Sequence, residues 1–123
     1  FLWPKELNSD LVLVHVVRSG CRACVRPTAV LADQQAVRED LPPVVIVALG
    51  EGSLGASEIV EGSPLEALAV ADPEGEFTGQ LGVLEIPSTL LLNRRTGELA
   101  RMEGYSQMGW STLLAALGES LGN

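Results

Sequence analysis

An almost unbroken run of apolar residues spans Leu11–Val17, interrupted only by His15. A strand with one face in water alternates apolar and polar side chains, whereas a strand covered on both faces is a continuous β-branched run. The run therefore predicts a strand in the centre of a sheet. Its length is far below the ~20 residues that span a bilayer.

Two cysteines follow this run closely. Ser19 and Gly20 end it, and Cys21 and Cys24 come next. From there apolar residues recur every three or four positions, at Val25, Ala29, Ala32 and Ala36. That spacing predicts an amphipathic helix which begins at the cysteines. The Cys-x-x-Cys pair is thus expected at a strand-to-helix junction.

The remaining segments alternate between strands and helices. Pro42 and Pro43 end the first helix, and the apolar run 44–49 predicts a second buried strand, parallel to the first. Residues 50–64 are rich in glycine and serine, which predicts a loop with one helical turn near 57–61. The other elements expected are a strand at 68–71, a helix capped by Asp72 with Pro73 at its first position, antiparallel strands at 88–92 and 98–103, and a last helix capped by Ser106 with Trp110 on its buried face. The fold class is therefore α/β, with a central mixed sheet flanked by helices.

Length and charge narrow the possible functions. The 123 residues fit one domain, 1–123, and 46% apolar residues suffice for a core. Sixteen acidic residues against eight basic ones give a net charge of -8 without any basic stretch, so nucleic acid is not expected as a partner. The first residue is Phe1 rather than Met, which fits the soluble part of a longer, membrane-anchored chain. Contact with a membrane is expected only through such an anchor.

The position of the dithiol favours redox chemistry. A cysteine at a helix N-terminus lies where unpaired N–H groups and the helix dipole stabilise an anion, and the adjacent Arg22 acts in the same direction. Cys21 is therefore predicted as the nucleophile and Cys24, almost one turn later, as the resolving thiol. The pair is also compatible with a structural disulfide, an incidental buried pair or half of a zinc site. One histidine and no further cysteine supply such a zinc site poorly, so no metal is expected.

With the dithiol in place, the chain from Leu11 to Leu121 resembles the thioredoxin superfamily. Two motifs carry this resemblance: Cys21-Arg22-Ala23-Cys24 after a buried strand, and Ile86-Pro87-Ser88-Thr89 at the start of a later one. The segments Val70-Ala-Asp-Pro-Glu-Gly, Leu81-Gly-Val and Thr96-Gly-Glu are similar to the TlpA/ResA-like branch, which includes membrane-tethered thiol reductases of the bacterial cell envelope.

The resemblance implies a set of site residues. Pro87 is expected in the cis form beside the dithiol, and the backbone of Ile86 is expected to pair with a substrate peptide as an added strand. A trans proline at the start of an edge strand is the alternative. Gly20, Arg22 and Ala23 flank the cysteines and complete the expected substrate-binding set.

Three positions depart from the pattern of the family. Gly20 stands where a tryptophan usually precedes the first cysteine, and Pro27 follows Cys24 by three residues where five is more common. His15 occupies the position of a buried acidic or amide residue that helps to move the proton of the second cysteine. It is a candidate proton acceptor, and the alternative is a hydrogen-bonded core histidine.

The resemblance implies a thiol:disulfide oxidoreductase that acts as a reductase in the cell envelope and needs no cofactor beyond its own disulfide. Its expected partners are protein thiols and disulfides together with an unidentified electron donor or acceptor. The expected location is extracytoplasmic, with a cytoplasmic one as the alternative. Two other functions stay open: a binding or chaperone module in which Cys21–Cys24 is structural, and an oxidase that donates disulfides.

Overall fold

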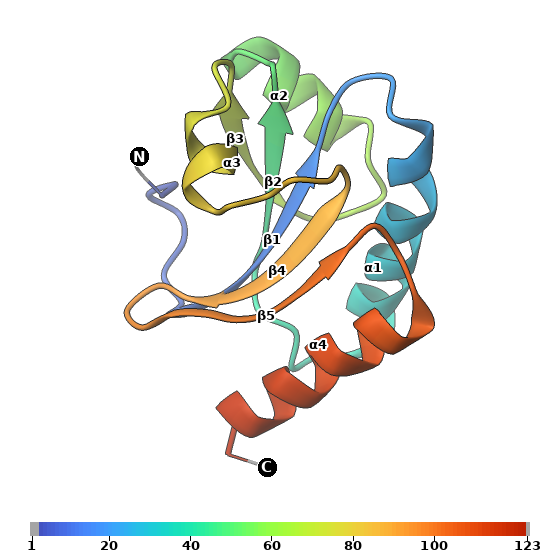
Figure 1. Ribbon diagram of the computed structural model, residues 1–123, viewed down its shortest axis with the longest axis vertical. Helices are drawn as coiled ribbons and strands as arrows, with labels where there is room; N and C mark the ends of the chain where they lie inside the picture. The colour runs from blue at the N-terminus through green and yellow to red at the C-terminus, as the bar shows by residue number, and fades with distance from the viewer. Residues whose placement is uncertain (1–2, 123) are drawn as a thin grey trace.

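The computed structural model describes residues 3–122, which form a five-stranded sheet with helices on both faces (Figure 1). The strands are β1 (Leu11–Val17), β2 (Val44–Leu49), β3 (Leu68–Asp72), β4 (Ser88–Asn93) and β5 (Gly97–Glu103). The helices are α1 (Val25–Val37), α2 (Ser53–Glu61), α3 (Glu76–Gln80) and α4 (Gln107–Ser120), and a short 3-10 helix (Arg22–Cys24) precedes α1. The strand order is β3-β2-β1-β4-β5.

The sheet is mixed and β1 is its central strand, as the sequence predicts. β1 runs parallel to β2 and antiparallel to β4, while β3 and β5 form the two edges. Leu13, His15 and Val17 point to one face of the sheet, and the alternate valines 12, 14 and 16 point to the other. All residues from Val12 to Val17 are buried because helices cover both faces.

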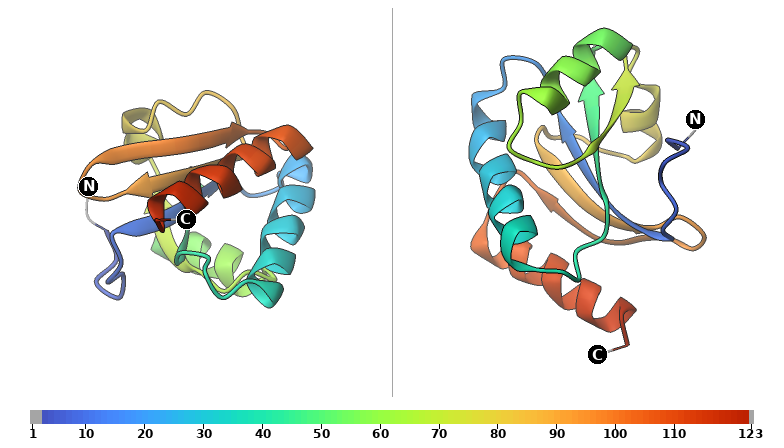
Figure 2. Two further views of the ribbon diagram at one scale, coloured as in Figure 1. Left: turned by 90° about the horizontal axis from the view of Figure 1, so that it is seen from below. Right: turned by 180° about the vertical axis from the view of Figure 1, so that it is seen from behind.

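The two faces carry different helices (Figure 2). One core packs the Leu13 face of β1 against Leu31 of α1 and against Trp110, Leu113 and Leu117 of α4. Ile59 of α2 packs at the margin of this core. The second core packs the opposite face against Phe77 of α3 and the N-terminal segment. Trp110 is a core residue, as predicted, and is 5% exposed.

The buried face of α1 differs from the predicted one. Val25 is 69% exposed and Ala29 and Ala36 are also exposed, whereas Pro27 and Leu31 are buried. The 3-10 turn at the cysteines is wound more tightly than an α-helix, so the buried face of α1 continues from Cys24 rather than from Val25. The predicted apolar face was therefore wrong, although the helix itself is present.

Two further expectations need correction. A nine-residue helix, α2, occupies most of the segment predicted as a loop at 50–64. α3 begins later than predicted, with Gly75 as its N-cap in the left-handed region at φ 72°. Asp72 still caps it, because its carboxylate accepts hydrogen bonds from the N–H groups of Phe77 and Thr78. Burial raises the pKa of Asp72, but the Thr78 hydroxyl also donates to this carboxylate, and together with the N–H groups it outweighs burial and holds that pKa below its usual value.

The sheet brings two distant segments together at one end. Val16, near the end of β1, pairs with Ser88, the first residue of β4. The cysteines follow β1 within a few residues, and Pro87 immediately precedes β4. The antiparallel register therefore places the dithiol and the Pro87 loop at the same end of the central strands. Among residues 3–122, no helix is long and apolar enough to cross a bilayer.

Candidate functional site: the Cys21–Cys24 disulfide

Cys21 and Cys24 form a disulfide with their Cα atoms 5.3 Å apart. Cys21 has an extended backbone and caps the 3-10 turn, in which the N–H of Cys24 bonds to the Cys21 carbonyl at 3.2 Å. Cys21 is half-buried, whereas Cys24 is only 6% exposed and belongs to the core that α1 and α4 cover. Arg22 and Ala23 between them are exposed. An incoming partner therefore meets Cys21 before Cys24.

The turn before Cys21 requires glycine. Gly20 adopts φ 71°, in the left-handed region, and a Cβ placed there would meet no atom within 4 Å. A tryptophan at this position would be strained by the backbone rather than by crowding. The departure of Gly20 from the family pattern thus has a local cause, which is the left-handed backbone of the turn.

A groove on the side facing α2 adjoins the disulfide. Two neighbouring cavities, of about 300 and 530 Å³, share Arg18, Cys21, Val25 and Ile59 among their lining residues. The smaller one also reaches Cys24 and Thr28. The sequence reasoning missed this α2 wall, although Ala56, Ile59 and Val60 have the i, i+3, i+4 spacing that indicates a helix face.

The loop before β4 forms the other side of the site. The Ile86–Pro87 peptide bond is cis. The Pro87 carbonyl accepts the N–H of Gly104 at 2.7 Å, and the Ser88 hydroxyl donates to the Glu85 carbonyl at 2.6 Å. Pro87 is buried, whereas Ile86 makes no backbone hydrogen bond with any residue in the described range 3–122. Its N–H and C=O groups are therefore available to another chain.

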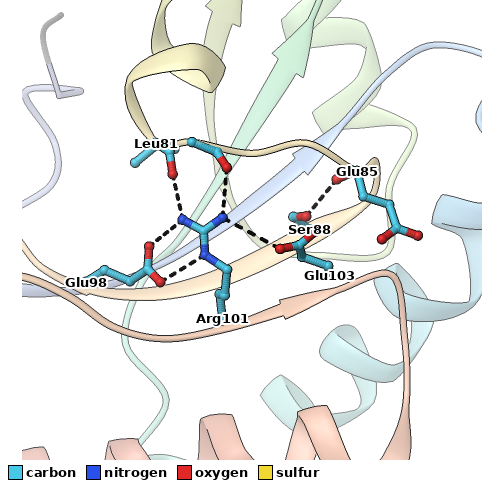
Figure 3. A network of polar contacts seen from close by, with 7 residues as sticks. Leu81, Glu85, Ser88, Glu98, Arg101 and Glu103 are labelled. Carbon is cyan, nitrogen blue, oxygen red and sulfur yellow. Dashed lines mark hydrogen bonds and ion pairs between the residues drawn. The ribbon is translucent and has the colours of Figure 1, made fainter.

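Arg101 of β5 holds this loop in place (Figure 3). Its guanidinium donates to the carbonyls of Leu81 at 2.6 Å and Gly82 at 3.1 Å, at the point where the loop leaves α3. The same group makes a two-pronged contact with both carboxylate oxygens of Glu98, and these hydrogen bonds hold the pKa of Glu98 below its usual value. Sequence reasoning gave no sign of this clamp, since its partners are backbone atoms about twenty residues away.

We expect Arg101→Gln to lower the free energy of unfolding by about 1–2 kcal/mol, because two carbonyls lose a charged donor and Glu98 loses its partner. Denaturant unfolding measures this loss. The matched control is Arg95→Gln in the β4–β5 turn, whose side chain is 77% exposed and 3.8 Å from Asp10. That exposed pair should contribute less than about 0.5 kcal/mol. Equal losses in both variants would contradict a clamp at Arg101.

His15 bridges two elements of the site. Its Nδ1 is 3.0 Å from the Thr89 hydroxyl on β4, and its Nε2 is 2.8 Å from the Thr28 hydroxyl on α1. Thr89 is its direct partner across the antiparallel pair, and Thr28 lies one turn after Cys24. His15 is fully buried, and burial lowers its pKa from 6.5 to about 4. The imidazole is therefore neutral at pH 7.

The site thus gathers most of the residues that the sequence singled out. Cys21, Cys24 and Pro87 lie at one end of the central strands β1 and β4. His15 is linked through Thr28 to α1, the helix that follows the dithiol. No group of three or more possible metal ligands occurs among residues 3–122. A disulfide with one half-buried and one buried cysteine thus lies at a strand-to-helix junction, beside a cis-proline loop in which the backbone of Ile86 has no partner among residues 3–122.

The arrangement of strands and helices is that of the thioredoxin-like fold. Against solved structures, the chain matches a Chlorobium tepidum protein assigned as the thiol:disulfide interchange protein DsbE, with a TM-score of 0.70, 23% identity and coverage of 89% of this chain and 82% of that one. This similarity confirms the predicted fold class. No protein-family model and no curated protein sequence matches the chain.

Two further structures share the fold. The pneumococcal exposed lipoprotein thioredoxin from Streptococcus pneumoniae has a TM-score of 0.67 and 19% identity, and the match covers 90% of this chain and 85% of that one. A secreted disulfide oxidoreductase from Mycobacterium tuberculosis also has a TM-score of 0.67, with 16% identity and coverage of 89% and 84%. At these identities the likeness establishes the fold, and the activity must be argued from the site.

Proposed function

We propose that this protein is a thiol:disulfide oxidoreductase that exchanges its Cys21–Cys24 dithiol with protein disulfides. The observation that carries the proposal is the unequal exposure of the two cysteines beside the Pro87 loop. Cys21 is half-buried, Cys24 is 6% exposed, and the free backbone of Ile86 borders the same edge of the sheet. A purely structural disulfide does not account for the unpaired backbone of Ile86 beside it.

In the reductase direction, the Cys21 thiolate attacks one sulfur of a partner disulfide and displaces the other as a thiolate, which gives a mixed disulfide. Cys24 then loses its proton and attacks the Cys21 sulfur. The partner leaves with both sulfurs reduced, and Cys21–Cys24 has lost two electrons. A separate thiol donor must return them. The reverse sequence oxidises a partner, and no cofactor beyond the dithiol takes part.

The substrate is proposed to lie along the Pro87 loop as an extended strand. The N–H and C=O groups of Ile86 would pair with its backbone, which explains why these two groups have no partner in the described chain. Gly20, Arg22 and Ala23 would contact the substrate on the other side of Cys21. Backbone pairing is independent of side chains, so this mode suits many protein partners.

We assign His15 a positioning role, with proton acceptance as the second possibility. Its two hydrogen bonds join α1 to β4, and thereby join the helix of the dithiol to the strand that follows Pro87. Nε2 is bonded to the hydroxyl of Thr28, which lines the same cavity as Cys24, so a proton from Cys24 would reach His15 by way of that hydroxyl. A pKa of about 4 makes His15 a weak acceptor at neutral pH. If His15→Asn shifts the pH profile of the Cys24 step, His15 accepts the proton; an unchanged profile with altered potential indicates positioning.

An extracytoplasmic location belongs to the same proposal. It is supported by the description of two similar structures as an exposed lipoprotein and a secreted oxidoreductase. A cell envelope offers disulfide-bonded partners, which are rare in the cytosol. The partner protein and the donor are protein thiols or disulfides of that compartment.

A redox titration tests the proposal directly. The protein is equilibrated with a ladder of glutathione and dithiothreitol ratios, free thiols are alkylated, and the masses give the reduced fraction. We expect a reversible two-electron couple, in which the ratio of reduced to oxidised protein changes tenfold for about each 30 mV of applied potential. A potential near that of thioredoxin, about -270 mV, supports a reductase, and one near about -120 mV supports an oxidase. A disulfide that resists both reagents contradicts the proposal and favours the binding module.

A further inference from the structure

The chain is acidic, but the surface around its disulfide is basic. Of its eight Lys and Arg residues, three lie within five positions of Cys21: Arg18, Arg22 and Arg26. All three are exposed. None has an acidic side chain of residues 3–122 within ion-pair distance. We call these three residues the arginine cluster.

The other arginines are engaged elsewhere. Arg38 pairs with Asp40, Arg95 with Asp10 and Arg101 with Glu98. Arg94 donates to the carbonyls of residues 7 and 9. Among the arginines of residues 3–122, only those of the arginine cluster have neither a carboxylate partner nor a carbonyl that accepts from the guanidinium. Their concentration at the dithiol therefore calls for a reason outside the chain.

The arginine cluster borders Cys21 on more than one side. Arg18 and Arg22 line the larger cavity together with Cys21, and Arg26 lies one turn after Arg22. The Arg26 guanidinium stands over the Tyr105 ring at 5.3 Å, on the side of the β5–α4 connection. That contact fixes its position without neutralising its charge.

Two carboxylates limit the extent of the basic surface. Glu58 of α2 is among the residues that line the larger cavity, and Glu85 lies beside Gly104 near the Pro87 loop. The excess positive charge is therefore confined to the segment from Arg18 to Arg26. A partner that binds along the Ile86 backbone would present one flank of its cysteine to this segment.

We infer that the arginine cluster selects partners whose reactive cysteine is flanked by acidic residues. The inference rests on the proposed function and names its substrate class: an acidic polypeptide segment that carries a disulfide. A carboxylate can accept two parallel hydrogen bonds from one arginine guanidinium. Attraction between the arginines and an acidic segment also raises the rate of association, and salt weakens this attraction. The mostly negative surface elsewhere would repel the same segment, so the partner docks at the dithiol and not beside it.

The test compares three disulfide peptides that differ only in having two Glu, two Gln or two Lys residues beside the cysteine. The reduced protein reacts with each, and each rate constant is divided by that of dithiothreitol with the same peptide, which removes intrinsic reactivity. We expect the Glu peptide to react about tenfold faster than the Lys peptide at 20 mM salt, and about equally at 500 mM. Equal rates at low salt would overturn the inference.

The triple variant Arg18→Gln, Arg22→Gln, Arg26→Gln should bring the Glu-to-Lys ratio to about one. Arg95→Gln, remote and exposed, is the control and should keep the tenfold ratio. Should the triple variant slow all three peptides equally, the cluster acts on the Cys21 thiolate and the inference fails. If the reduced wild-type protein reacts with none of the peptides, the proposed function itself fails, so the two failures are distinguishable.

Discussion

Cys24→Ser is expected to trap the partner protein on Cys21. In this variant the more accessible thiol, that of Cys21, still attacks a partner disulfide, but no second sulfur resolves the mixed disulfide. An intramolecular thiol acts at a far higher effective concentration than millimolar external thiol, so turnover should fall at least about a thousandfold. The stable adduct appears as a band in non-reducing electrophoresis that disappears when the sample is reduced, and its mass identifies the partner.

Cys21→Ser is the matched control for this experiment. The one remaining sulfur is that of Cys24, which is 6% exposed in the oxidised protein and lies within the core under α1 and α4. It should form adducts much more slowly, by at least about a hundredfold, because attack requires an exposed thiolate. Similar trapping by both variants would contradict the assigned order of attack. Trapping by neither would leave the disulfide with a structural role.

The position of the dithiol was predictable because two local patterns meet there. The run Leu11–Val17 needs no tertiary information to indicate a strand covered on both faces, and a turn with a Cys-x-x-Cys element follows it at once. The second side of the site depended on the resemblance. Nothing in Ile86-Pro87 alone indicates that it lies beside Cys21, and only the pairing of Val16 with Ser88 places it there.

The helices were less predictable because tertiary packing overrides weak local signals. Alanines lie on several sides of α1, so the sequence did not identify the buried face of this helix. The tight turn at Arg22–Cys24 rotates that face to Pro27 and Leu31. The segment that forms α2 was predicted as a loop because it contains Gly55 and is flanked by other glycines, and a glycine costs about 1 kcal/mol within a helix. Burial of Ala56, with Ile59 packed against the core, offsets that cost.

The contacts of His15 were out of reach for a different reason. Its partners are 13 and 74 residues away, and threonine hydroxyls carry no sequence signal of their own. The direct opposition of His15 and Thr89 is a matter of strand register. An apolar strand with one histidine predicts a buried imidazole, but only the assembled sheet shows that both ring nitrogens are hydrogen-bonded.

Lowering the pH from 7 to 5 is expected to reduce the free energy of unfolding by about 2 kcal/mol, mainly through His15. Its pKa in the folded protein is about 4, against 6.5 for the exposed group. Between these values the unfolded chain binds a proton that the folded chain does not, so stability is complete above about pH 6.5 and falls as the pH drops toward 4. His15 is the one histidine of the chain, and the lowered carboxylate pKa values of Asp72 and Glu98 take effect mainly below pH 5, where the carboxylates of the unfolded chain become protonated.

Urea unfolding at pH 7, 6 and 5 measures this slope, and His15→Asn is the control. The asparagine amide retains a donor and an acceptor for Thr28 and Thr89 but does not titrate, so the variant should be less stable at pH 7 and nearly flat down to pH 5. The stability difference between the two proteins should therefore narrow as the pH falls. Parallel slopes in both would show that His15 is not held neutral by burial, and the bridge between the dithiol helix and β4 would lose its main support.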